Sequence, residues 1–196
     1  LSLAEIIQQA RIREANEEDS GGNDKDDSDS TGSGSYGSDK SWRRPMPTTP
    51  SGGQTFGSTD GRPFPHDGVD YGGDAYDGHP IHAVHAGTII QVGAPGHNWP
   101  ASKIGYVITE HTTDGHNVIY QEFGLTPGKG GKAYVSKGDK VKVGQKIGKL
   151  GHLDGSGTGD HVHIGVAQKG HTVWDHGGES TSGWLDLEKL VAKSKK

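Results

Sequence analysis

Short apolar runs separated by glycine and proline turns decide the fold class of this chain. Turn signals such as Asp114-Gly115 and Pro127-Gly128 lie between the runs. No long amphipathic helix interrupts them, so the pattern predicts an all-β domain, mainly one antiparallel sheet with a loop-walled groove, and a closing helix over Leu185–Ala192. The expected strands are Ile81–Val84, Thr88–Val92, Tyr106–Glu110, Asn117–Phe123, Val141–Val143, Ile147–Leu150 and His161–Val166.

The amino-terminal part of the chain has a different composition. Only 29% of the 196 residues are hydrophobic and 34 are glycine, which is too little apolar material to pack the whole length. Residues 15–55 are rich in glycine, serine and aspartate and are expected to form a flexible acidic linker. Ser2 and Glu5 fit a capping box, so residues 1–14 are expected to form a short helix that ends an upstream region. The folded part is expected over residues 56–196, as a monomeric domain within a larger parent protein.

Composition also limits the ligands that the chain can bind. It has no cysteine and 12 histidines, so a metal ion would have to be held by imidazole and carboxylate groups. The net charge is −5, and the basic face expected of a nucleic-acid binder is not present in the sequence. No apolar run approaches the roughly 20 residues that cross a bilayer, so no membrane span is expected.

The segment His66–Asp70 places a histidine and an aspartate four positions apart. Prolines before it and a glycine within it argue against a helix. On a regular strand the two side chains would lie about 13 Å apart, at ~3.3 Å per residue, which is too far for one metal ion. If both are ligands, the chain must bend between them, with His66 in a loop, Asp70 on the strand that follows and Gly68 permitting the bend.

The segment His161-Val162-His163 lies inside an apolar run. Residues two apart share one strand face, so both imidazoles are expected to point to the same side. One can bind a metal ion while the other reaches a water beside it, and the spacing does not decide which does which. Two histidines and one carboxylate suit a catalytic zinc site with three protein ligands and a water, although they would also suit non-haem iron.

The order of these motifs resembles that of the lysostaphin-type zinc endopeptidases, which cut peptidoglycan. The resemblance covers residues 57–167. The segments that carry it are His66-x3-Asp70, Ile81–Gly87, Val135–Gly148, and Gly155–His163 with its His161-x-His163 ending. Carried over position by position, it implies that His66, Asp70 and His163 bind one zinc ion and that His161 is catalytic.

Two positions depart from the pattern of that family. Many members have a second catalytic histidine after a tyrosine, whereas this chain has Glu122, as in the enterolysin A-like branch. Glu122 is then either a general base or a group that only orients His161, and both roles stay open. The second departure is Gly165, together with the absence of an acidic residue just after the His-x-His strand.

The resemblance implies a zinc metalloendopeptidase that hydrolyses stem or cross-bridge peptides of bacterial peptidoglycan. Such an enzyme is expected outside the cell or at the cell wall, as a bacteriolytic protein or as part of a phage tail particle. The alternative is a catalytically impaired wall-binding domain of the same fold, because the second histidine is missing. A biotinyl- or lipoyl-carrier module, which Val135–Gly148 also resembles, has no use for the two histidine motifs.

Overall fold

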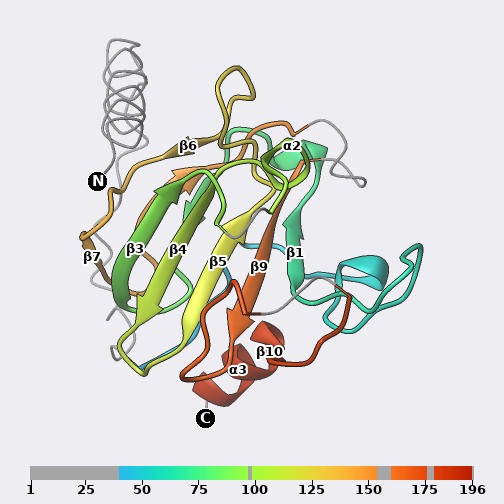
Figure 1. Ribbon diagram of the computed structural model, residues 1–196, viewed down its shortest axis with the longest axis vertical. Helices are drawn as coiled ribbons and strands as arrows, with labels where there is room; N and C mark the ends of the chain where they lie inside the picture. Colours follow the sequence, from blue (N-terminus) through green and yellow to red (C-terminus); the bar gives the residue numbers. More distant parts are fainter. Residues whose placement is uncertain (1–39, 97–98, 154–159, 176–178, 196) are drawn as a thin grey trace.

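A mainly antiparallel sheet forms the centre of the molecule, as predicted (Figure 1). The computed structural model describes residues 40–96, 99–153, 160–175 and 179–195. Within these ranges the main sheet has seven strands in the order β1-β9-β5-β4-β3-β7, and β10 also pairs with β9. The bounds are β1 Val69–Gly72, β3 Gly87–Gly93, β4 Val107–Thr112, β5 Asn117–Gln121, β7 Lys140–Val141, β9 His161–Ala167 and β10 Trp184–Leu185.

Smaller elements complete the domain. A second sheet has the order β2-β8-β6, with β2 at Pro80–His82, β8 at Lys146–Lys149 and β6 at Lys132–Ala133. Two short 3-10 turns, η2 and η3, lie at Gly52–Gln54 and Asp74–Tyr76, and the helices are α2 at Ala101–Ile104 and α3 at Leu187–Ser194. No helix in the described ranges has the length and apolar character needed to cross a membrane.

The closing helix begins two residues later than predicted. Asp186 is its N-cap and accepts a hydrogen bond from the backbone N–H of Glu188. The two residues before that cap belong to β10, because Trp184 and Leu185 pair with Ala167 and Val166 of β9. The expected helical spacing was therefore right, but Leu185 belongs to β10 and Asp186 is the cap.

Alternation along β9 separates the two faces of the main sheet. Val162, Ile164 and Val166 are fully buried in the main hydrophobic core. His161 and His163 point to the opposite face, which also carries a smaller apolar cluster around Trp184. The prediction that both histidines share one face is confirmed.

Gly165 has a packing role on this second face. A Cβ atom there would lie 2.7 Å from the Trp184 ring and 2.9 Å from the Ile119 side chain. Any larger residue would have to displace the indole. This departure from the family pattern is therefore explained by a tryptophan that covers the strand.

The packed domain begins earlier than the expected boundary at residue 56. Trp42 and Met46 are buried and belong to the main core. The Arg44 guanidinium makes a 2.6 Å ion pair with Glu188 of α3, and the backbone N–H of Arg43 bonds to the carbonyl of Val84. Linker-like composition thus conceals an anchored segment, and the boundary expected at residue 55/56 is too late. The helix expected at residues 1–14 and most of the expected linker lie outside the described residues.

Candidate metal centre

His66 lies in the loop that precedes β1. Its backbone is fixed by two hydrogen bonds, from His66 N to the Ser58 carbonyl and from Gly57 N to the His66 carbonyl. The ring Nδ1 lies 3.2 Å from the carbonyl of Thr55, so Nδ1–H donates and Nε2 stays available as a metal ligand. The loop therefore sets both the position and the tautomer of the ring.

Asp70 lies on β1, directly opposite His163 of β9. The bend predicted between His66 and Asp70 is present, because His66 is in a loop and β1 begins at Val69. Gly68, however, is needed for space: its φ is not in the left-handed region, but a Cβ there would overlap the His163 ring. The glycine is thus explained by close approach of backbone and imidazole rather than by an unusual dihedral angle.

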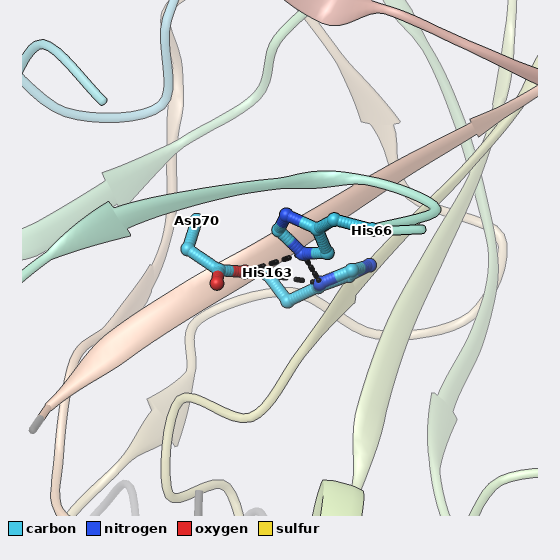
Figure 2. Close-up of side chains that lie close together, drawn as sticks. All are labelled: His66, Asp70 and His163. Atoms are coloured by element: carbon cyan, nitrogen blue, oxygen red, sulfur yellow. Dashed lines mark hydrogen bonds and ion pairs between the residues drawn. The ribbon is translucent and has the colours of Figure 1, made fainter. Parts of the chain in front are cut away.

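Three side chains converge on one point from these elements (Figure 2). His66 Nε2 lies 3.1 Å from Asp70 Oδ1 and 3.0 Å from His163 Nδ1. His163 Nδ1 lies 3.0 Å from the same Asp70 oxygen. The three residues are 1%, 1% and 4% exposed, respectively for His66, Asp70 and His163.

This geometry fits a metal ion. Ligand atoms around tetrahedral zinc stand roughly 3.3 Å apart, given bonds of about 2.0–2.1 Å. Three ligand atoms of the preferred kind, all buried and close together, match that requirement closely. His161 is not the third member of this group: its Nε2 lies 3.9 Å from Asp70 Oδ1 and points toward a different partner.

The charges of the site are strongly coupled when no metal is bound. Burial by itself raises the pKa of Asp70, but the close contacts with His163 and His66 outweigh it and hold that pKa well below its usual range. Burial lowers the pKa of His163, whereas the hydrogen bond to Asp70 and the charge of Asp67 raise it, to about 9. The two shifts favour an ionised Asp70 carboxyl and a protonated His163 ring.

Glu122 lies just after β5 and contacts His161. Its Oε2 is 3.1 Å from His161 Nε2, and its Oε1 accepts a hydrogen bond of 3.0 Å from the Gln121 side chain. Among the described residues it is the one non-glycine with positive φ, at 66°. A strand that continued past Gln121 would turn the next side chain to the core face, so this left-handed backbone brings the carboxylate to the metal side.

The environment of Glu122 favours its ionised form. Burial raises the pKa of this carboxyl, but the hydrogen bond from His161 and the charges of His163 and His161 lower it further than burial raises it. Glu122 is therefore a carboxylate at neutral pH. Its contact with His161 was foreseen only through the family resemblance, because nothing in the sequence predicts the left-handed backbone.

Two other histidines are buried away from the metal centre. His116, beside the β4–β5 hairpin turn, is 8% exposed. His85 is fully buried. Both rings pack against Trp42, with centroid separations of 4.7 Å for His85 and 5.6 Å for His116. Their burial depends on the segment that contains Trp42, which lies within the expected linker.

Comparison with solved structures defines the class of the domain. CbpA from L. salivarius REN is 26% identical over 79% of this chain and 97% of its own, with a TM-score of 0.61. The antimicrobial peptidase lysostaphin from Staphylococcus simulans is 27% identical over 74% of this chain and 50% of its own, with a TM-score of 0.51. The prophage-encoded M23 protein EnpA from Enterococcus faecalis shares the fold at 22% identity, covering 77% and 97% of the two chains, with a TM-score of 0.50.

The fold is therefore that of a lysostaphin-type peptidase domain. The sequence profile of Peptidase family M23 matches residues 64–175, more than half of the chain. The chain belongs to peptidase family M23. A search of curated proteins gave no match.

Proposed function

We propose that this domain is a zinc endopeptidase that hydrolyses peptide bonds in bacterial peptidoglycan. The observation that carries the proposal is the convergence of His66, Asp70 and His163 beside the hydrogen-bonded pair His161 and Glu122. Membership of family M23 supports peptidase activity. The resemblance to lysostaphin, a peptidase with antimicrobial action, supports the cell wall as substrate.

In this proposal Nε2 of His66, Oδ1 of Asp70 and Nδ1 of His163 would hold the zinc ion. The bound ion would supply Lewis-acid chemistry, that is, polarisation of the scissile carbonyl and a lower pKa for the attacking water. The protein contributes a rigid, dry ligand set, because all three side chains are buried and their elements are tied together by the pairing of β1 with β9.

Glu122 supplies the proton transfer and His161 stabilises the negative charge that develops. Glu122 is ionised at neutral pH, so its carboxylate is able to accept the proton of the attacking water and pass it to the leaving amine. His161 Nε2 lies between this carboxylate and Asp70, and as an N–H donor it would stabilise the negative oxygen of the tetrahedral intermediate. The alternative role, in which Glu122 only orients the His161 ring, uses the same hydrogen bond.

The substrate determines where the enzyme works. Peptidoglycan lies outside the cytoplasmic membrane, so the domain is proposed to act extracellularly or at the cell wall. It does so either in a secreted bacteriolytic protein or in a phage tail particle that delivers it there. In both settings the domain is one part of a larger protein.

The test is hydrolysis of purified walls of different chemistry. Metal-stripped protein, the same protein with one equivalent of zinc, and the zinc-treated His163→Ala variant are incubated with walls that differ in stem and cross-bridge peptides. New amino termini are expected only with the zinc-loaded wild type, and mass spectrometry of the fragments identifies the bond. Absence of new amino termini from every wall would overturn the proposal.

A second candidate function is wall binding with activity lost. It is favoured by one observation, the presence of Glu122 where many lysostaphin-type enzymes have a histidine. In that case the zinc-loaded protein would sediment with purified walls but release no amino termini. The two functions therefore give opposite results in the same experiment.

A further inference from the structure

The second oxygen of Asp70 has a partner outside the metal ligands. Oδ1 faces His66 and His163, whereas Oδ2 accepts a hydrogen bond of 2.7 Å from Nη2 of Arg62. The Asp70 side chain is 1% exposed and that of Arg62 is 34% exposed. A surface-accessible guanidinium thus reaches down to the outer side of a buried carboxylate.

Arg62 is itself held in place by its own loop. Its Nε donates a hydrogen bond of 3.2 Å to the carbonyl of Gly53 while Nη2 contacts Asp70. Because the guanidinium is planar, two bonds in different directions define its orientation. The same loop supplies the Thr55 carbonyl that fixes the tautomer of His66. Residues 53–62 therefore contact the outer sides of two of the three proposed ligands.

We infer that Arg62 is a positioning residue of the metal centre, one that keeps Asp70 a ligand through a single oxygen. This inference rests on the proposed zinc site. A carboxylate can offer a metal one oxygen or two, and a hydrogen bond that occupies Oδ2 leaves Oδ1 for the metal. Partners of this outer kind orient the ligand before the metal arrives.

The positive charge of Arg62 has the opposite effect, because it repels a cation. That repulsion is weakened by solvent, since about a third of the Arg62 side chain is exposed. The carboxylate oxygen that Arg62 contacts is buried, so its orientation depends on this hydrogen bond much more than on water. Orientation is therefore expected to outweigh repulsion, and loss of Arg62 is expected to weaken zinc binding.

The experiment measures zinc affinity on purified full-length protein by competition with a chromogenic chelator. Arg62→Ala is expected to bind zinc at least ~10-fold more weakly than the wild type, the lower end of the range for outer partners of metal ligands. Arg62→Lys keeps one charged donor for Asp70 but cannot also reach Gly53, so it is expected to stay within about 3-fold.

The matched control is Arg44→Ala. Arg44 is exposed to a similar degree as Arg62, 32% against 34%, and makes an ion pair of similar length with Glu188, away from the metal ligands. It is expected to leave zinc affinity within about 2-fold. Thermal unfolding of the metal-free proteins separates orientation from a general loss of stability: both alanine variants are expected to unfold at similarly lowered temperatures, and only Arg62→Ala is expected to change zinc affinity.

Three results would overturn the inference: unchanged zinc affinity in Arg62→Ala, tighter binding in that variant, or equal weakening in Arg44→Ala. Failure of the proposed function looks different. If the wild type binds zinc and shows this pattern of affinities but cuts no wall, the role of Arg62 stands and the peptidase proposal fails. If the wild type binds no zinc, both fail.

Discussion

Two clusters of the same composition, two histidines and one aspartate, lie near opposite ends of β9. One is the candidate metal centre around His163, near the start of the strand. The other comprises His85, Asp114 and His116, and the His116 Nδ1 lies 3.0 Å from the carbonyl of Ala167, the last residue of β9. Residue types alone do not distinguish them.

Geometry does distinguish them. In the second cluster His85 Nε2 and His116 Nε2 lie 3.7 and 4.0 Å from Asp114 Oδ2, whereas the separations in the metal centre are 3.0–3.1 Å. Within the described part of the chain, only the His66, Asp70 and His163 group has all its ligand atoms within 4.8 Å of one another. The difference teaches that the close approach of the ligand atoms, rather than the residue types, makes a metal site. The second cluster instead packs the Trp42 segment against the sheet.

The largest effect is expected from removing one histidine of each cluster. His163→Ala loses a ligand, so zinc binding at neutral pH and at least ~10³-fold of the activity should be lost, since the metal contributes several kcal/mol to the transition state. His116→Ala should keep zinc and retain activity within about 3-fold, but should lose about 2 kcal/mol of unfolding free energy through lost packing and an unpaired carbonyl. Zinc titration, wall hydrolysis and urea unfolding measure these. Loss of zinc in His116→Ala would contradict the comparison.

One glutamate near each cluster provides the next contrast. Glu122→Gln should lower turnover about 10²-fold with zinc content kept, because an amide cannot accept the proton. Glu110, whose Oε2 accepts a 2.7 Å hydrogen bond from the Tyr120 hydroxyl, faces the core, and Glu110→Gln should leave turnover within about 3-fold. Rates on the same wall preparation, with zinc measured in each sample, make the comparison. Near-full activity in Glu122→Gln would assign Glu122 no proton-transfer role.

Glu110 should instead control how stability depends on pH. The pKa of Glu110 is raised to about 8, because burial and the charge of Asp114 outweigh the lowering by the Tyr120 hydrogen bond. The pKa of an unfolded glutamate is about 4.3, so the folded protein binds the extra proton between pH ~4.3 and ~8. The free energy of unfolding should therefore fall as pH rises through this window, by about 2 kcal/mol between pH 6 and 8.

Urea unfolding of the metal-free protein at pH 6, 7 and 8 measures that slope. Glu110→Gln cannot ionise, so the fall of about 2 kcal/mol in unfolding free energy between pH 6 and 8 should be absent in this variant. Its difference in stability from the wild type should therefore change with pH. A constant difference between the two proteins across this range would show that Glu110 does not titrate there.

The last prediction concerns zinc affinity and pH. The pKa of His163 is raised to about 9 in the metal-free protein, so at neutral pH zinc has to displace a proton from this ring. Below pH 9 the dissociation constant for zinc should therefore rise about tenfold for each unit by which the pH falls, from this proton alone. Chelator competition at pH 6, 7 and 8 measures the slope, and a flat profile would contradict it.

Local sequence patterns predicted most of the sheet. The expected strands Thr88–Val92, Tyr106–Glu110 and His161–Val166 differ from β3, β4 and β9 by at most two residues at each end. They were predictable because alternation and turn residues act over a few positions. The buried Trp42 segment was not predictable, since its flanking composition is that of a linker and its partners lie far away in the chain.

The candidate site was predictable in its residue types but not in its assignment. Spacing indicated that His161 and His163 share a face and left open which one binds metal. The register of β1 on β9 places His163 opposite Asp70 and His161 opposite Gly72, so His163 is the one that converges with Asp70. A one-residue change in that register would alter the assignment.

The sequence by itself determined the strands, the turns and the kinds of ligand, because these depend on neighbouring residues and on side-chain chemistry. Only the tertiary structure decided that His163 Nδ1 meets Asp70 and His66, which are 93 and 97 positions away. It likewise decided that the Glu122 carboxylate turns toward His161. The same holds for His85 and His116, whose nitrogens lie farther from the Asp114 oxygen than the ligand atoms of the metal centre lie from one another. The physical reason is that a metal site requires positions accurate to a fraction of an ångström, and only the pairing and packing of distant strands define positions that closely.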